Sequence, residues 1–124
     1  MTDTNNLLLY VTDPAASARF YAALLAREPV EASPTFVLFI LPSGLALGLW
    51  GRAGVQPAPV TTGGGCELGF KVKSHEAVDA THAHWQASGA SIALPPTDLE
   101  FGRSFVALDP DGHRLRVYSL HEEM

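Results

Sequence analysis

Apolar residues follow two spacings along this chain, and the two spacings predict the elements of its first half. Short alternating or β-branched apolar runs predict strands, whereas Phe20, Tyr21 and Leu24 fall on one face of a helix. Asp13 followed by Pro14 is a start signal for that helix. The predicted elements are a strand at 7–11, a helix from 14 to about 27, and strands at 34–41 and 45–50.

The same order of elements returns after a linker. Residues 51–65 are rich in Gly, Pro, Ala and Thr and show no periodicity. Ser74 then predicts the start of a second helix, and Gly89 predicts its end. The remaining predicted elements are strands at 67–73 and 91–94, a loop at 95–100, and two strands joined by a four-residue turn, Asp109-Pro110-Asp111-Gly112.

This internal repeat predicts an α+β fold in a single domain made of two βαβββ modules. The modules would span about 5–51 and 66–120, with the linker at 52–65. Each helix would cover one face of its sheet. The two modules would then form a curved mixed sheet, a half-barrel cup, with the helices on its outer face.

The alternation of side chains along strands assigns each one to the helix side or to the cup side of the sheet. With a four-residue turn, Phe105 pairs with Arg116 and both point into the cup. The residues expected in the cup are Leu8, Tyr10, Val37, Phe39, Ala46, Gly48, Trp50, Glu67, Gly69, Lys71, Arg103, Phe105, Arg114, Arg116 and Tyr118. Phe36, Leu38 and Val106 are expected on the helix side. A shift of one residue in the pairing would invert any of these strands.

Composition narrows the functional classes. The 124 residues are 47% hydrophobic and carry a formal net charge of −5 without a basic run. That charge argues against nucleic acid or an anionic membrane as a partner. The single cysteine, Cys66, fits a reducing compartment, and neither a signal peptide nor a transmembrane run is evident. We therefore expect a soluble cytoplasmic protein.

The usual catalytic sets are not evident in the sequence. The histidines lack a second histidine or a carboxylate at metal-ligand spacing, and no Ser, His and acid set predicts a nucleophilic triad. His82 and His84 are two residues apart on the predicted second helix, and we expect them to face solvent. Cys66 is expected to be unreactive, because no cation that would lower its pKa is evident beside it.

The order of several motifs resembles the vicinal oxygen chelate superfamily, which includes glyoxalase I, extradiol dioxygenases and the bleomycin-resistance proteins. The resemblance covers residues 6–120. It rests on Val11-Thr12-Asp13 followed by Phe20-Tyr21, and on Asp109-Pro110-Asp111-Gly112-His113 before the last strand. Further motifs are similar to those of the branch that binds phenazine-type antibiotics. These are Leu9-Tyr10-Val11, Arg27-Glu28-Pro29-Val30, a strand ending in Trp50, and Phe101-Gly102-Arg103-Ser104-Phe105.

Enzymes of that superfamily hold a divalent metal with four side chains in the cup. By the resemblance, those positions here are Asn6, Gly48, Glu67 and Arg116. Glu67 is an ordinary metal ligand, whereas Gly48 has no side chain and Arg116 is a fixed cation. We therefore expect a protein without a metal or another cofactor. The family usually forms homodimers in which both chains complete the cups, so a homodimer is expected.

The resemblance thus implies a metal-free protein that binds a planar aromatic small molecule, such as a phenazine-like antibiotic, and confers resistance by sequestration. The residues expected to bind the ligand are Trp50, Phe39, Phe105, Tyr118, Tyr10, Phe101, Arg103, Arg116 and Glu67. Aromatic walls suit a planar ligand through offset stacking, and Arg103 or Arg116 could bind a ligand carboxylate.

Other interpretations remain open at this point. The aromatic residues could be ordinary core residues, and Glu67 with Arg116 could be a structural salt bridge that fills a vacated metal site. The chain could also be a metal-dependent lyase or dioxygenase of the same superfamily, using Glu67 with further ligands that the sequence does not identify. A protein that kept the fold and lost both activities is the last alternative.

Overall fold

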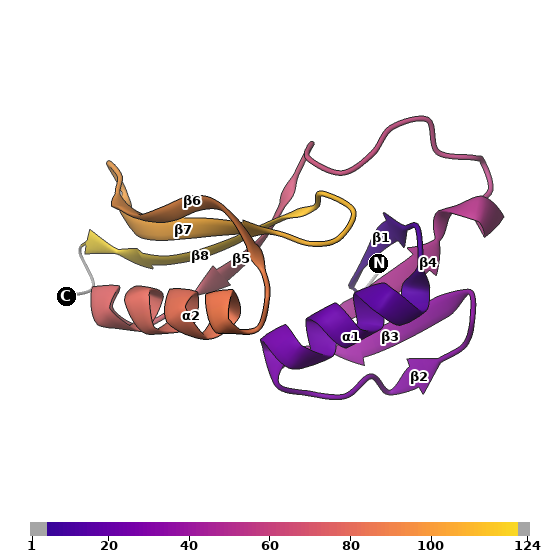
Figure 1. Cartoon of the computed structure of the whole chain (residues 1–124), viewed down its shortest axis with the longest axis horizontal. Helices are drawn as coiled ribbons and strands as arrows, with labels where there is room; N and C mark the ends of the chain where they lie inside the picture. Colours follow the sequence, from indigo (N-terminus) through magenta and orange to yellow (C-terminus); the bar gives the residue numbers. More distant parts are fainter. Residues whose placement is uncertain (1–4, 122–124) are drawn as a thin grey trace. The chain divides into compact units, whose positions relative to one another are not determined.

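The computed structural model describes residues 5–121 and divides into two compact units, Met1–Thr62 and Gly63–Met124. Each unit contains one mixed four-stranded sheet and one α-helix, and the helix lies along one face of the sheet of its own unit (Figure 1). The predicted α+β fold of two βαβββ modules is therefore confirmed. Within 5–121, no helix is long and apolar enough to cross a membrane.

The first unit is built around the sheet order β1-β4-β3-β2, in which β1 is parallel to β4 and the other pairs are antiparallel. Its elements are β1 (Asn6–Val11), α1 (Pro14–Leu25), β2 (Glu31–Ala32), β3 (Phe36–Ile40), β4 (Ala46–Gly51) and the 3-10 helix η1 (Arg52–Gly54). Asp13 caps α1 as predicted, because its carboxylate accepts hydrogen bonds from the N–H groups of Ala15 and Ala16 at 3.1 and 3.3 Å. The helix ends where Ala26 adopts a left-handed φ of 53°.

The second unit repeats this plan with the order β5-β8-β7-β6, again with the first strand parallel to the last. Its elements are β5 (Glu67–Lys71), α2 (His75–Ala87), β6 (Ser91–Asp98), β7 (Gly102–Leu108) and β8 (Arg114–Leu120). Ser74 caps α2 by accepting a hydrogen bond from the N–H of Ala77 at 3.0 Å. The helix is followed by Gly89 at a φ of 95°, a conformation that favours glycine.

Each unit buries its own core between helix and sheet. The large buried apolar residues of the first unit include Val11, Tyr21, Leu24, Val37, Phe39, Leu47 and Leu49. Those of the second unit include Leu68, Val78, Trp85, Phe105, Val106, Leu115 and Val117. We call the sheet face that points away from the helix of the same unit its open face.

The two hairpins, β3–β4 and β7–β8, have the same three-residue loop, Pro-x-Gly. In the first, Leu41 donates its N–H to the carbonyl of Leu45 at 2.9 Å, and Gly44 donates to the carbonyl of Leu41 at 2.8 Å. In the second, Asp109 donates to His113 and Gly112 donates to Asp109, both at 3.0 Å. Gly44 and Gly112 take φ values of 93° and 84°, as the last residue of such a loop requires. The second loop thus comprises Pro110, Asp111 and Gly112, whereas the sequence prediction also counted Asp109. The predicted loop was therefore one residue too long.

Because of this one-residue difference in loop length, the side chains of β3 and β7 point to the sheet faces opposite to those predicted from the sequence. Val106 pairs with Arg116 rather than with Leu115, and Phe105 pairs with Val117. In the first unit, Phe39 pairs with Leu47 on the helix side. The predicted open-face positions of Phe39, Phe105, Val37 and Arg103 are wrong, and Phe36, Leu38, Ser104 and Val106 take that face instead. The predicted faces of β1, β4, β5 and β8 are correct.

The strand β6 is longer than predicted and includes residues 95–98 of the segment expected to be a loop. It runs through Pro95 and Pro96, and its pairing with β7 shifts register between Ile92 and Leu94 and again between Leu94 and Thr97. Proline is tolerated here because β6 is an edge strand with bulges, so the missing N–H groups are not needed by a neighbour. The two-residue strand β2 was also not predicted.

Candidate functional site

The open face of the first sheet is apolar over β1, β3 and β4. Its residues are Asn6, Leu8, Tyr10, Phe36, Leu38, Ile40, Ala46, Gly48 and Trp50. Leu8 and Ile40 remain 40% and 38% exposed, although both are large hydrophobic residues. A contiguous apolar surface of this kind typically marks a binding site rather than ordinary protein surface.

Trp50 and Tyr10 form the aromatic end of this face. They are direct partners in the parallel pairing of β1 and β4, and both are half-buried. Their ring centroids are 6.1 Å apart with an angle of 82° between the planes, which is an edge-to-face contact. The structure therefore brings together two of the residues predicted to bind an aromatic ligand.

Gly48 lies beneath two apolar side chains of the same face. A Cβ added to it would come within 2.7 Å of Leu8 Cδ2 and 2.8 Å of Phe36 Cζ. The lack of a side chain thus lets Leu8 and Phe36 close over the middle of β4. They cover the position that the family resemblance assigns to a metal ligand.

The open face of the second sheet carries a cluster of charges instead. Arg116 on β8 donates to Glu67 on β5 through Nε at 2.7 Å and through Nη2 at 2.9 Å, which is a bidentate pair. Its third nitrogen, Nη1, donates to the hydroxyl of Ser104, a fully buried residue, at 3.0 Å. Arg116 is therefore held in one place through all three guanidinium nitrogens.

Arg114 is the second cation of this cluster and is held much less tightly. Its Nε lies 3.0 Å from Oε2 of Glu67, and this buried nitrogen makes no hydrogen bond to any residue in the described range. The Arg114 side chain is 41% exposed, against 20% for Arg116. Two guanidinium groups thus share one carboxylate, and one of them has spare donors.

The electrostatic state of the cluster follows from these contacts. The hydrogen bonds from Arg116 lower the pKa of Glu67, partial burial opposes that effect, and the positive charges of Arg116 and Arg114 lower the pKa further. The hydrogen bonds to Glu67 raise the pKa of Arg116. Glu67 is consequently an anion and Arg116 a cation across the physiological pH range.

A second aromatic pair lies beside the charged cluster. Tyr118 on β8 contacts Phe101 with ring centroids 6.2 Å apart and an interplanar angle of 78°, and Phe101 is 44% exposed. On the neighbouring strand β5, Gly69 is the direct partner of Arg116 and is exposed. A Cβ at Gly69 would meet only Tyr118 Cε1 within 4 Å, at 3.6 Å. The face is therefore open at Gly69.

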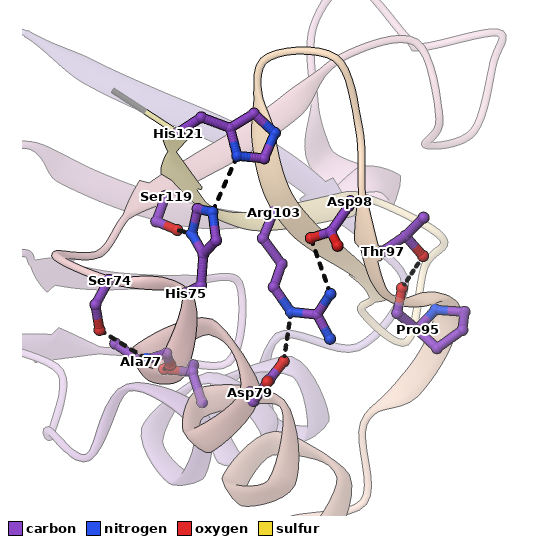
Figure 2. Close-up of polar contacts among 11 residues, drawn as sticks. Ser74, His75, Ala77, Asp79, Pro95, Thr97, Asp98, Arg103, Ser119 and His121 are labelled. Atoms are coloured by element: carbon purple, nitrogen blue, oxygen red, sulfur yellow. Dashed lines mark hydrogen bonds and ion pairs between the residues drawn. The ribbon is translucent and has the colours of Figure 1, made fainter. Parts of the chain in front are cut away.

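Arg103, which was predicted to reach the ligand, is occupied on the helix side. Figure 2 shows its guanidinium between two carboxylates, with Nε 2.9 Å from Asp79 on α2 and Nη1 3.0 Å from Asp98 on β6. The hydrogen bond that Arg103 donates to Asp79 is the main cause of its raised pKa, followed by the one it donates to Asp98. This side chain ties the helix to the edge of the sheet.

Phe105 and Phe39 also lie away from the open faces. Phe105 is fully buried and packs edge-on against Trp85 and His82 of α2, at centroid distances of 5.4 and 5.3 Å. Phe39 is equally buried. His82 is therefore half-buried against an aromatic ring and not simply solvent-facing as predicted, whereas His84 is exposed.

A chain of side-chain hydrogen bonds that sequence reasoning missed joins α2 to the end of β8 (Figure 2). His75 Nδ1 contacts the hydroxyl of buried Ser119, His75 Nε2 lies 3.0 Å from His121 Nδ1, and His121 Nε2 lies 2.9 Å from the carbonyl of Leu99. A carbonyl only accepts, so with neutral rings the donors run from Ser119 through His75 and His121 to Leu99. Because the hydroxyl is buried, we interpret the chain as structural.

The positions that bind metal in the superfamily do not fit a metal ion here. Both oxygens of Glu67 are engaged by arginine, Arg116 has no lone pair to give, and Gly48 is covered by hydrocarbon. Asn6 is exposed on β1. Among residues 5–121, no group of three or more His, Cys, Asp or Glu side chains is arranged to hold a metal ion.

The sequence placed Arg114 and Arg116 on the correct face, whereas other site residues were not predicted. Arg114 alternates with Arg116 along the last strand, so simple parity places both on one face. The sequence does not identify Gly69 as a site residue, because a glycine in a strand can mark either a locally weakened strand or a place where a ligand or another backbone approaches closely. Phe36 was assigned to the wrong face because the loop length was wrong.

Comparisons with known proteins agree with this fold. Residues 4–117 match the family model of the Glyoxalase/Bleomycin resistance protein/Dioxygenase superfamily. The chain is 35% identical over 126 residues to the phenazine antibiotic resistance protein EhpR of Enterobacter agglomerans, covering 96% of this chain and 94% of the other. It is 52% identical to protein ATC0852 of Agrobacterium tumefaciens, whose solution structure superposes with a TM-score of 0.87 over 97% of this chain and 98% of that one. A glyoxalase-related enzyme from Fulvimarina pelagi shares the fold at 24% identity, with a TM-score of 0.84 and coverage of 96% and 88%.

Proposed function

The chain belongs to the glyoxalase/bleomycin resistance protein/dioxygenase superfamily, and within that family we propose that it binds a planar aromatic small molecule without a metal and without catalysing a reaction. The proposed ligand class is the phenazine antibiotics, because a relative of nearly equal length at 35% identity is a phenazine antibiotic resistance protein. Binding would keep the antibiotic from its target, which is resistance by sequestration.

The observation that carries this proposal is the half-buried Tyr10–Trp50 pair on an apolar open face. The open-face side chains of β1, β3 and β4 bear no charge, and two of the large ones are more than a third exposed. A flat, weakly polar ring can cover such a surface and stack against Trp50, at about 0.5–1.5 kcal/mol per aromatic pair beyond area burial.

The second unit supports the same ligand class independently. Tyr118 and exposed Phe101 offer another aromatic pair, beside the gap at Gly69. The proposal therefore assigns ligand contact to Trp50, Tyr10, Tyr118 and Phe101, and assigns Phe39 and Phe105 to the core. Glu67 and Arg116 remain proposed ligand-binding residues because they lie on the open face. Arg103 is no longer proposed as one because it lies on the helix side.

The absence of metal is part of the proposal and follows from the chemistry of the side chains. A guanidinium held 2.7 Å from Glu67 occupies that carboxylate and repels a divalent cation. Added Zn²⁺, Ni²⁺ or Mn²⁺ should leave the melting temperature unchanged, because a ligand specific to the native state would raise it. One tightly bound metal ion per chain in elemental analysis, together with lyase or dioxygenase turnover, would overturn the proposal.

Tryptophan fluorescence tests the binding itself. The chain has two tryptophans, and Trp85 is buried in the helix-side core. In a Trp85→Phe background, Trp50 is the sole indole, and phenazine should quench it saturably. The same titration by calorimetry checks that quenching reflects binding. Absence of binding in both measurements would contradict the proposed function.

A homodimer is also proposed, since the sheets end in the edge strands β1 and β2 in one unit and β5 and β6 in the other. Edge strands carry unpaired backbone groups that proteins usually cover. Sedimentation velocity over a range of micromolar concentrations should show a dimer. A monomer at every concentration would contradict this part of the proposal and leave the ligand titration to be interpreted per chain.

A further inference from the structure

We infer that the ligand of this protein carries a carboxylate, and that Arg114 on the open face of the second unit is the side chain that binds it. This inference rests on the proposed function for the aromatic part of the ligand. It adds the charge of the ligand and the residue that selects for that charge.

The first observation is an imbalance of charge on one sheet face. The open-face positions of β5, β7 and β8 in the described chain carry one acid, Glu67, and three cations, Lys71, Arg114 and Arg116, of which the two arginines flank Glu67. The neighbours of the two arginines on β7 are Leu108 and Val106, which offer no charge. This local excess of positive charge occurs in a chain whose net charge is −5, so it does not follow from overall composition.

The second observation is that the two arginines are used differently. Arg116 donates from Nε and Nη2 to Glu67 and from Nη1 to Ser104, so each of its nitrogens has a partner. Arg114 approaches Glu67 only through Nε, which lies at 3.0 Å without making a hydrogen bond. Its side chain is also twice as exposed as that of Arg116. Arg114 thus has a buried Nε–H that no described residue satisfies, on a side chain that is 41% exposed.

A purely structural role for Arg114 explains these contacts less well. Glu67 is already neutralised by the bidentate pair with Arg116, so a second cation is not needed for its charge. A partly exposed ion pair contributes little to stability, and two neighbouring guanidinium groups repel each other. An incoming carboxylate would restore local neutrality. The planar fork of a guanidinium matches a carboxylate through two parallel hydrogen bonds.

The third observation is the space beside the arginines. Gly69 is the direct strand partner of Arg116, and a Cβ there would touch only the ring of Tyr118. A strand glycine with nothing above it permits the close approach of a ligand. A planar ring lying over Gly69 would meet the ring of Tyr118, and a substituent on it could be directed along β8 toward Arg116 and Arg114, the strand partners of Gly69 and Glu67.

The experiment compares two probes of the same ring system that differ in charge. Phenazine is neutral, and phenazine-1-carboxylate is an anion at neutral pH. The wild-type protein should bind the carboxylate about tenfold or more tightly, as expected for a charge-assisted hydrogen bond. Arg114→Gln should remove this preference while leaving the affinity for phenazine within about twofold. Arg114→Lys should keep part of it, because an ammonium retains the charge without the planar fork.

Arg19→Gln is the matched control, since Arg19 is an exposed residue of α1 and its loss changes the net charge by the same amount. This variant should keep the full preference for the carboxylate. Equal binding of both probes by wild type, or a preference that survives in Arg114→Gln, would overturn the inference while the proposed function stands. If neither probe binds the wild-type protein, the proposed function fails and the inference fails with it.

Discussion

Glu67 makes both of its hydrogen bonds to Arg116, its diagonal neighbour, although Arg114 lies directly opposite it in the register of β5 and β8. The residue opposite Arg116 is Gly69, which has no side chain to hold the guanidinium over its own partner position. Arg116 therefore reaches across to Glu67 and is fixed there by Ser104 as well. The direct partner, Arg114, is left with the weaker contact.

The Glu67–Arg116 pair predicts a specific dependence of stability on pH. The folded state lowers the pKa of Glu67, so the pair stabilises the fold above the unfolded pKa of about 4.3 and loses that effect as pH falls through the lower folded value. Denaturant melts of wild type, Glu67→Gln, Arg116→Gln and the double variant give the coupling between the two residues. The coupling should be constant from about pH 8 to pH 5 and should shrink below about pH 4. A coupling that is the same at pH 3 and pH 7 would contradict an ionic pair.

Trp50 and Leu49 point to opposite faces of β4, which allows binding and folding to be separated. Trp50→Ala should weaken phenazine binding by about 1–3 kcal/mol through lost stacking and apolar contact. It should cost less stability than the ~3–5 kcal/mol typical of a deleted core aromatic. Leu49 is fully buried, so Leu49→Ala should cost about 2–5 kcal/mol of unfolding free energy and leave affinity nearly unchanged. Calorimetric titrations and urea melts on the same preparations measure both effects, and the reverse result would place the ligand elsewhere.

Phe105 and Phe101 form a second matched pair. Phe105→Ala removes a fully buried ring that packs on Trp85 and His82, so it should lower the free energy of unfolding by about 3–5 kcal/mol. Phe101 is 44% exposed, so Phe101→Ala should cost about 1 kcal/mol or less and should weaken phenazine binding through lost contact with the ring. Urea melts read the first effect and ligand titration the second. Weak destabilisation by Phe105→Ala would mean that the register of β7 is not the one described.

Gly69 can be tested by filling the space above it. Gly69 does not adopt a positive φ, and valine is favoured in strands. Gly69→Val should therefore leave the melting temperature nearly unchanged. It should nevertheless weaken binding of phenazine and of its carboxylate by about tenfold or more, because the branched side chain occupies the ligand's place. Gly48→Val is the control for the first sheet. Its Cβ would come within 3 Å of Leu8 and Phe36, so it should destabilise the fold by about 1–3 kcal/mol. Full ligand affinity in Gly69→Val would exclude the space over Gly69 from the binding site.

The sequence was sufficient to predict most of the elements and their repetition. The caps Asp13 and Ser74 have local chemistry that the chain carries by itself, and both make the expected hydrogen bonds. The repeat predicted that the two modules share one plan, and the two sheets do have equivalent strand orders, although the order itself was not predicted. Strands predicted from apolar runs were right except at β6, where Pro95 and Pro96 argue against a strand unless it is known to be at an edge.

The sequence could not establish which sheet face each side chain of β3 and β7 occupies. A hairpin loop of three residues and one of four are both compatible with Asp109-Pro110-Asp111-Gly112, and only the backbone path of Gly112 distinguishes them. Because side chains alternate, the difference of one residue exchanged Phe105 for Ser104 and Val106 on the open face. The contact of Arg116 with Ser104 was hidden for the same reason.

The two strand glycines, Gly48 and Gly69, differ in how well each tolerates substitution by a larger residue. In the first module, Leu8 and Phe36 already fill the place that a larger residue at 48 would need, so variation there acts on folding before it acts on binding. In the second module, a Cβ at 69 would meet only the ring of Tyr118 within 4 Å, so variation there should spare the fold and, under the proposed function, should change which ligands fit. A population of variants under selection by a new aromatic compound would therefore acquire its first substitutions around Gly69. Gly48 would stay fixed as a condition of keeping the first module folded.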